Sequence, residues 1–228
     1  MAAVRKSAKP VRRKVGRPRG GDADLRGKLI DAAIAQFTRA GIGATSLRAV
    51  ARAAGVTPAM LHYYFGDKKQ MTMAVVSERL LPAVAPLRAH VEAAGGDPSE
   101  IAGAFVDGMA EMVAANPWLP ALWVREVLCE GGALRDVVFK RAVPQLPQLL
   151  ARRFAAAREL GLLDARLDPR LMVVSLVGLT LFPAAGAPIW RKVFDADELD
   201  ADALRHHALA LLENGMGARG RTRKEKTR

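Results

Sequence analysis

The stretch "TSLRAVARAAGVTPAMLHYYFGDKKQM", residues 45–71, decides the fold of the N-terminal part of the chain. Its apolar residues recur at intervals of three and four on either side of Gly55, as they do along one face of a helix. Glycine at this point suits a tight turn with a positive φ. We therefore predict two short helices, over residues 46–53 and 58–64, joined by this turn, with Thr45 as the N-cap of the first.

The second of these helices has a clear start signal. Thr57 is a good N-cap, and Pro58 occupies the first helical position, where the missing N–H costs nothing. Once the apolar residues are assigned to the inside, the outer face of this helix consists of Thr57, Ala59, His62 and Tyr63. Two helices with this spacing form either a helix-turn-helix, which places one helix in the DNA major groove, or a purely structural corner.

Helical patterns continue on both sides of this pair. Upstream, apolar periodicity predicts a helix over residues 24–40. Downstream, Asp67 is an N-cap for a longer helix that runs toward Leu81 and is disturbed by Pro82 and Pro86. Three helices thus make up the N-terminal unit, and a fourth leads out of it.

The rest of the chain also consists of helical patterns. We predict helices over residues 98–115, 118–130, 134–142, 144–160, 169–182 and 197–214. No sustained alternation of period two occurs, and the chain is 50% hydrophobic, which is ample for a packed core. The predicted class is all-α, with an N-terminal three-helix helix-turn-helix domain and a C-terminal helical domain.

Positive charge is concentrated at the two ends of the chain. The first twenty residues include eight basic side chains and no acidic one, and residues 216–228 include six basic and one acidic. Because the whole chain carries +12, the part between these ends is nearly neutral. Such ends bury too little apolar area to offset the entropy of ordering, so we predict disorder at residues 1–22 and 216–228. Their charge indicates a polyanionic partner: nucleic acid first, an anionic membrane surface second.

The N-terminal arm contains "GRPR", residues 16–19. This is the core of AT-hook-like sequences, in which arginines flank a Gly/Pro kink and enter a narrow A·T minor groove. Two interpretations are open: specific minor-groove contact by Arg17 and Arg19, and general attraction to phosphates.

The sequence contains no recognisable catalytic or metal-binding arrangement. The single Cys129 excludes an internal disulfide, and we expect a buried, inert thiol. The histidines outside the quoted stretch, His90, His206 and His207, have no nucleophile or metal-ligand partner at an informative spacing. We therefore predict a protein that is not an enzyme and that has no catalytic residue, metal or cofactor.

One uncharged segment, Leu171–Trp190, is long enough to span a bilayer. Pro183 and Pro188 are expected to break its second half, which leaves an apolar helix ending near Phe182. A helix of that length is typical of a core or a subunit interface. We predict no membrane partner and, because no apolar stretch follows the basic N-terminus, a cytoplasmic protein without a signal peptide.

The quoted stretch, together with the preceding "LRGKLIDAAIAQFTRAGI", resembles the DNA-binding domain of the TetR family of bacterial transcriptional regulators. The likeness covers residues 24 to about 75 and departs from the family pattern at His62, where the family usually has Tyr. It implies a one-component regulator, most simply a repressor, that binds a palindromic double-stranded DNA operator as a homodimer. It also implies an unknown small-molecule effector.

The resemblance and the predicted facing together define a set of DNA-binding residues. Arg48 is assigned to a guanine edge, with a solvated surface position as the alternative. Thr45 and Ser46 are assigned to phosphates, and so is Lys68 at a helix N-terminus. The predicted DNA-binding residues are Arg17, Arg19, Thr45, Ser46, Arg48, Thr57, Ala59, His62, Tyr63 and Lys68.

The charge distribution and the resemblance together divide the chain into four parts. These are a basic arm (1–22), a DNA-binding domain (23–70), an effector-binding and dimerisation domain (71–215) and a basic tail (216–228). The two C-terminal helices are expected to pair with their twins in the dimer. An Arg in place of Leu176 is therefore expected to dissociate the dimer, because a charge would be buried without a partner.

Apolar residues of the second domain are candidates for an effector pocket, with an ordinary core position as the alternative for each. They are Phe105, Met109, Met112, Trp118, Trp123, Phe154 and Met172. Arg125 and Glu126 are interpreted as polar groups that orient the ligand or as a surface pair. The alternative function is that of a peripheral membrane protein with cationic tails and an apolar helix; a small-molecule enzyme comes third.

Overall fold

The computed structural model describes residues 20–138, 145–213 and 215–216. The helices are α1 (Gly20–Ala40), α2 (Leu47–Ala53), α3 (Pro58–Phe65), α4 (Lys68–Val75), α5 (Leu81–Ala93), α6 (Pro98–Ala115), α7 (Leu119–Trp123), α8 (Arg135–Val137), α9 (Gln145–Glu159), α10 (Pro169–Phe194) and α11 (Ala201–Glu213). Two π-helical turns, η1 (Val76–Leu80) and η2 (Val124–Leu128), follow α4 and α7. No strand occurs within the described ranges, which confirms the predicted all-α class.

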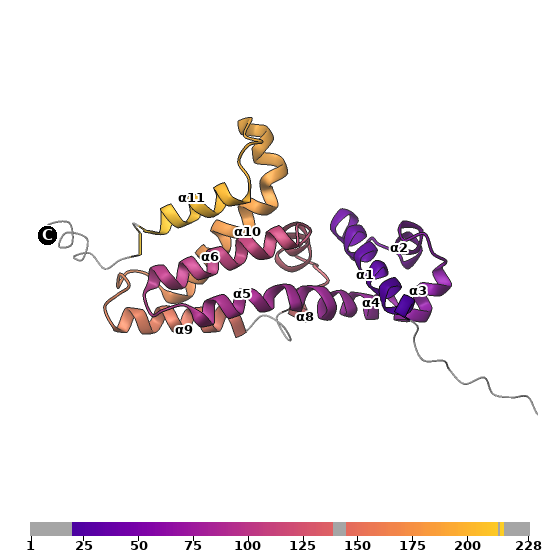
Figure 1. Cartoon of the computed structure of the whole chain (residues 1–228), viewed down its shortest axis with the longest axis horizontal. Coiled ribbons are helices and arrows are strands. Elements are labelled where there is room, and N and C mark those ends of the chain that lie inside the picture. Colours follow the sequence, from indigo (N-terminus) through magenta and orange to yellow (C-terminus); the bar gives the residue numbers. More distant parts are fainter. Residues whose placement is uncertain (1–19, 139–144, 214, 217–228) are drawn as a thin grey trace, which may run out of the picture.

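Helices α1, α2 and α3 form a compact unit at one end of the molecule (Figure 1). Leu29, Ala33 and Phe37 lie about one turn apart on α1 and are fully buried. They belong to the same hydrophobic core as Val50 of α2 and Leu61 of α3. The predicted helix at residues 24–40 is therefore present, although it begins at Gly20, inside the segment assigned to the basic arm.

The turn between α2 and α3 has the predicted geometry. Gly55 has φ +68°, a conformation that costs a side-chain-bearing residue energy and glycine nothing. Thr57 occupies the N-cap position of α3, but its side chain makes no capping hydrogen bond. Ser46, rather than Thr45, caps α2, and its hydroxyl accepts the Ala49 N–H at 3.2 Å.

Thr45 was predicted as the N-cap of α2, and this prediction is wrong. Its side chain is buried, and its hydroxyl donates to the carbonyl of Gly41 at 2.7 Å. The same carbonyl also accepts the Thr45 backbone N–H at 3.2 Å, so Thr45 closes the turn after α1 instead of capping α2.

Helix α4, η1 and α5 follow one another without a break and form the rod that leaves the N-terminal unit (Figure 1). Pro82 and Pro86 were expected to disturb this rod, but it continues to Ala93. Pro82 cannot donate to the helical ladder and would crowd the carbonyl four residues before it. The π-helical turn η1 lies just before Pro82, and in it the Leu81 N–H donates to Val76 O, five residues earlier. This wider turn makes room for the proline ring beside the preceding carbonyls.

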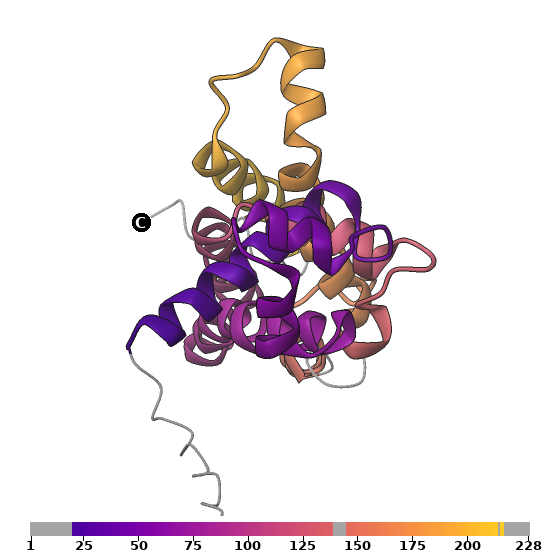
Figure 2. The same cartoon turned by 90° about the vertical axis from the view of Figure 1, so that its right-hand side faces the viewer.

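Helix α10 is longer than predicted, because it continues through Pro183 and Pro188 to Phe194. The Trp190 indole N–H donates to the Pro183 carbonyl at 2.8 Å, a side-chain hydrogen bond across the segment that contains the two prolines. Figures 1 and 2 both show the C-terminal end of α10 (orange) standing away from the other helices. Asp168 is the N-cap of α10, and hydrogen bonds from Arg170 hold the pKa of the Asp168 carboxyl well below its usual range.

Smaller differences concern the ends of other elements. The predicted helix at 134–142 is reduced to α8 within the described residues, since residues 139–144 lie outside them. The predicted helix at 118–130 is divided into α7 and η2, and α11 begins later than expected. Cys129, expected to be buried, is exposed because the helix ends at Leu128.

The structure predicts a contrast between two neighbouring residues of α3. Leu61 is fully buried, whereas Tyr63 is 80% exposed. Leu61→Ala should lower the free energy of unfolding by about 2–5 kcal/mol, because it leaves a cavity in the core. Tyr63→Ala should unfold like the wild type. Urea denaturation followed by circular dichroism measures both; equal losses would show that the assigned facing of α3 is wrong.

Candidate functional site

The outer face of α3 is open to solvent. Thr57, Ala59, His62 and Tyr63 are all exposed, while Leu61 and Phe65 of the same helix are buried. The four residues predicted to face outward therefore do so. Ser46 and Arg48 are exposed as well, at the start of α2.

Two aromatic side chains shape this face. The Tyr63 ring meets the Tyr64 ring edge to face, with centroids 5.3 Å apart. The His62 Nδ1 atom lies 2.6 Å from the Gly66 carbonyl oxygen. Because a carbonyl only accepts hydrogen bonds, Nδ1 carries the proton, and Nε2 of the neutral ring is an acceptor.

Lys68 and Thr45 do not take the positions that were predicted for phosphate contacts. Lys68 is half-buried, and its Nζ donates to the carbonyls of Ile42 at 3.0 Å and Gly43 at 2.9 Å. These carbonyls compensate the positive charge at the N-terminus of α4, a role that had been expected of a DNA phosphate. The exposed cation in this first turn is Lys69, which the sequence reasoning did not assign to DNA.

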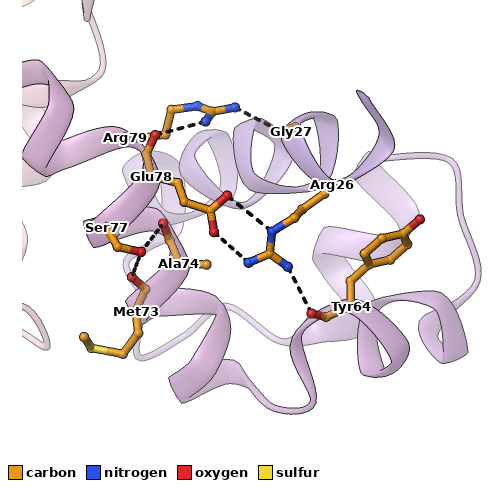
Figure 3. A network of polar contacts seen from close by, with 8 residues as sticks. All are labelled: Arg26, Gly27, Tyr64, Met73, Ala74, Ser77, Glu78 and Arg79. Atoms are coloured by element: carbon orange, nitrogen blue, oxygen red, sulfur yellow. Dashed lines mark hydrogen bonds and ion pairs between the residues drawn. The ribbon is translucent and has the colours of Figure 1, made fainter. Parts of the chain in front are cut away.

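The first π-helical turn, η1, anchors both α1 and α3 (Figure 3). Arg26 of α1 donates to the two carboxylate oxygens of Glu78 at 2.6 and 3.2 Å. It also donates to the carbonyl of Tyr64 at 3.1 Å, and its guanidinium lies 4.6 Å from the centre of the Phe65 ring. One arginine therefore holds together α1, the end of α3 and η1.

Arg79, next to Glu78, adds a second connection to α1. Its Nε donates to Asp31 at 2.9 Å, and its Nη2 donates to the Gly27 carbonyl at 3.4 Å, a contact drawn in Figure 3. Two arginines thus attach the first half of α1 to η1. Arg26 reaches from α1 to η1, and Arg79 reaches from η1 to α1.

The second π-helical turn, η2, anchors the other end of α1. Arg125 donates to the carbonyl oxygens of Arg39 at 2.9 Å and Thr38 at 3.3 Å, which lie in the last turn of α1. A cation is favourable there because it satisfies free carbonyls and interacts with the negative end of the helix dipole.

Glu126 is buried, with 4% of its surface exposed, and both carboxylate oxygens accept hydrogen bonds. Oε1 accepts from the Ile42 N–H at 2.9 Å, and Oε2 accepts from the Ala133 N–H at 3.0 Å. Gly41 allows this approach, because it has φ +86° and a Cβ there would lie 3.2 Å from Oε1. Glu126 therefore joins the α1–α2 turn to the C-terminal domain.

Arg125 and Glu126 had been interpreted as ligand-orienting groups or a surface pair, and both interpretations are wrong. Neither lines the cavity described below. An acidic residue within the apolar run "LWVREVL" indicates a buried carboxylate that needs hydrogen-bond donors. No spacing in the sequence indicates that these donors lie next to α1.

An apolar cavity of about 80 Å³ lies between α5, α6, α7, α9 and α10. Of the predicted pocket residues, Phe105, Met109, Met112 and Trp123 line it. Phe154 and Met172 belong to the surrounding core, and Trp118 packs against that core, so these three are not in the cavity wall. Trp123 is the last residue of α7 and directly precedes η2.

A wider groove of about 1010 Å³ runs between α6 and α11 and is open to solvent. Charged residues line it, among them Arg205, which pairs with Asp107 at 2.8 Å. Within the described residues, no group of three or more His, Cys, Asp and Glu side chains is arranged to hold a metal ion. The apolar cavity is the better candidate for a small-molecule site.

The contacts of Glu126 predict a stability effect. Glu126→Gln should lower the free energy of unfolding by about 1–3 kcal/mol, because its amide NH₂ must face one of the two backbone N–H groups. Glu130→Gln is the matched control, since Glu130 is exposed on the same segment. Urea denaturation and amide hydrogen exchange at Ile42 measure the effect; if the two variants behave alike, Glu126 does not hold the turn.

Comparison with known proteins bears on this site. Residues 29–75 match the family model of bacterial regulatory proteins, tetR family. The HTH-type transcriptional regulator BetI from Rhizobium meliloti (strain 1021) is 39% identical over 64 residues, 28% of this chain. The match covers only 32% of BetI, about a third of its length.

Solved structures share the fold over most of the chain. The ketosteroid transcriptional regulator KstR2 of Mycobacterium tuberculosis has a TM-score of 0.69 at 20% identity, over 84% of this chain and 94% of KstR2. The fatty acid degradation regulator FadR from Bacillus halodurans has a TM-score of 0.59 at 21% identity, over 86% and 96%. SmeT, in a complex with triclosan, has a TM-score of 0.60 at 19% identity, over 86% and 93%.

The matched family and these proteins are transcriptional regulators and not enzymes, in agreement with the interpretation of the sequence. The structural likeness extends from the helix-turn-helix through the C-terminal helical domain. Residues 29–75 thus form a domain of the tetR family of bacterial regulatory proteins, and the chain as a whole shares the fold of these solved regulators.

Proposed function

We propose that this protein is a cytoplasmic, ligand-responsive repressor that binds a palindromic DNA operator as a homodimer. The observation that carries the proposal is the division of α3 into a buried face and an exposed face that includes Tyr63, within a domain matched to DNA-binding regulators. In this proposal the DNA-binding domain is residues 23–70, together with the beginning of α1 at Gly20. Residues 71–215 bind the effector and form the dimer.

In the proposed complex, α3 enters the major groove with its exposed face. The Thr57 hydroxyl, which makes no capping bond, and Ser46 contact phosphates. Arg48 reads a guanine edge, and Nε2 of His62 accepts from the amino group of adenine or cytosine. Lys69 takes over the phosphate contact first assigned to Lys68.

The basic arm has a supporting role in this proposal. Arg17 and Arg19 lie outside the described residues, and the two interpretations of the arm, minor-groove insertion and attraction to phosphates, stay open. In both, the arm adds affinity to the contacts of α3.

An exposed apolar stripe supports the homodimer. Leu171, Val174, Phe182, Ile189 and Val193 of α10 are each more than 60% exposed and recur at helical spacing along one face. Gly178 lies in the same stripe with no atom within 4 Å of a Cβ built there. A second copy of α10 can therefore approach closely along the whole stripe.

One observation favours the alternative of membrane association. Helix α10 is long and apolar enough to cross a membrane, and only 22% of its most apolar window is buried. A second copy of the chain explains the same exposure.

The contacts of η2 suggest how a ligand acts on DNA binding. A ligand in the cavity touches Trp123. Two and three residues further on, Arg125 holds the last turn of α1 and Glu126 holds the α1–α2 turn. Two recognition helices of a dimer must fit major grooves about 34–36 Å apart, so a small tilt of both domains loses contacts in both half-sites. The ligand does this if it binds the DNA-incompetent state more tightly.

Selection of bound sequences from random DNA tests the proposal directly. The full chain should enrich a palindrome with half-sites one helical turn, or a multiple of it, apart, because the dimer axis imposes its symmetry. Tyr63→Ala and Arg48→Ala should weaken binding to the selected site without changing the fold. Arg152→Ala, at an exposed position on α9, is the control. Enrichment of no sequence, or of a single unrepeated half-site, contradicts the proposal.

The dimer is tested by two substitutions on α10. Val174 is 65% exposed in the protomer, so Val174→Arg should convert the dimer to a folded monomer in sedimentation velocity. Leu176 is fully buried in its own protomer, so Leu176→Arg should unfold the protein instead of dissociating the dimer as first predicted.

Circular dichroism distinguishes the two outcomes. A wild-type chain that is monomeric at micromolar concentration contradicts the dimer. Flotation of the wild-type chain with anionic vesicles, but not of Val174→Arg, would favour the membrane alternative.

A further inference from the structure

The walls of the apolar cavity restrict the chemistry of its ligand, an inference that rests on the proposed ligand-responsive function. Among the described residues that line it, every side chain other than Trp123 is apolar, and none is charged. An ionised ligand would lose its hydration there without gaining a partner. The cavity therefore selects a neutral molecule.

Trp123 is the only polar side chain among these described lining residues. Its Nε1 is buried and has no hydrogen-bond partner among the described residues. Indole N–H groups in protein cores usually find an acceptor, as Trp190 does at the Pro183 carbonyl, 2.8 Å away. The indole is a donor only, so the group that it lacks is an acceptor such as a carbonyl or ether oxygen.

The cavity also has adaptable walls. Met109 and Met112 of α6 contribute to its lining. Methionine is unbranched and has several rotatable bonds, so it repacks around ligands of different shape. The cavity volume of about 80 Å³ thus does not limit the ligand to a molecule of that size.

We propose that the cavity binds a neutral, mainly apolar molecule that carries a hydrogen-bond acceptor, and that this acceptor takes the Trp123 indole N–H. Trp123 ends α7, and Arg125, which holds the last turn of α1, lies two residues further on. The ligand is thus recognised beside the segment that positions the DNA-binding domain.

Three probes of nearly the same shape test the proposal in isothermal titration calorimetry of the full chain without DNA. Acetophenone is neutral with a carbonyl acceptor, α-methylstyrene has a CH₂ group in place of that oxygen, and benzoate is charged. We expect both neutral probes to bind and benzoate not to bind over the same concentration range.

The two neutral probes differ in their hydration as well as in their acceptor, so a comparison of their affinities does not measure the hydrogen bond alone. Trp123→Phe isolates the hydrogen bond, because it removes the indole N–H and leaves the probes unchanged. The substitution should weaken acetophenone about tenfold, the effect of one lost buried hydrogen bond, and should change the affinity for α-methylstyrene far less. Trp118→Phe is the matched control, since Trp118 does not line the cavity. It should change neither affinity.

The indole proton of Trp123 in the wild-type protein gives a second measurement, which does not depend on the stability of the variant. Its NMR signal should move downfield with acetophenone relative to its position with α-methylstyrene. Three results would each overturn the proposal. They are equal weakening of both neutral probes by Trp123→Phe, binding of benzoate as tight as that of acetophenone, and no binding of either neutral probe.

A mobility shift on the selected operator separates this proposal from the proposed function. The expected calorimetric pattern with an unchanged operator affinity would support the ligand class and contradict the coupling of ligand to DNA. The same pattern in a chain that selects no DNA sequence would support the ligand class and contradict the regulator.

Discussion

A buried carboxylate connects the two parts of this protein. Glu126 accepts the Ile42 N–H from the α1–α2 turn and the Ala133 N–H from its own domain. Loss of either partner leaves a buried charged group unsatisfied, so the turn and η2 are held in one relative position. Because α2 begins directly after this turn, the orientation of the helix-turn-helix depends on the position of η2.

The same arrangement explains why both π-helical turns lie beside α1. At η1, Glu78 and Arg79 hold the first half of α1, and at η2, Arg125 and Glu126 hold its end. Hydrogen bonds are directional, so these contacts fix how α1 lies against the two turns. A displacement of either turn would therefore also move α1.

The exposed stripe of α10 imposes the other constraint on the molecule. A helix that packs on one side only leaves its opposite apolar face in contact with water, which is unfavourable in proportion to the area. In the proposed dimer a second copy covers this face, and the two DNA-binding units are then related by a twofold axis. The proposed operator symmetry follows from the same surface.

The sequence by itself determined α1, α2 and α3, the turn at Gly55 and the outward face of α3, because periodicity, caps and glycine act over a few residues. The course of α10 through Pro188 and the contacts of Lys68 and Glu126 were decided by the tertiary structure. Glu126 and Ile42 are 84 residues apart in the sequence, and Lys68 and Ile42 are 26 apart. Side chains that satisfy distant backbone groups leave no periodic pattern, so only the folded chain could show which groups they meet.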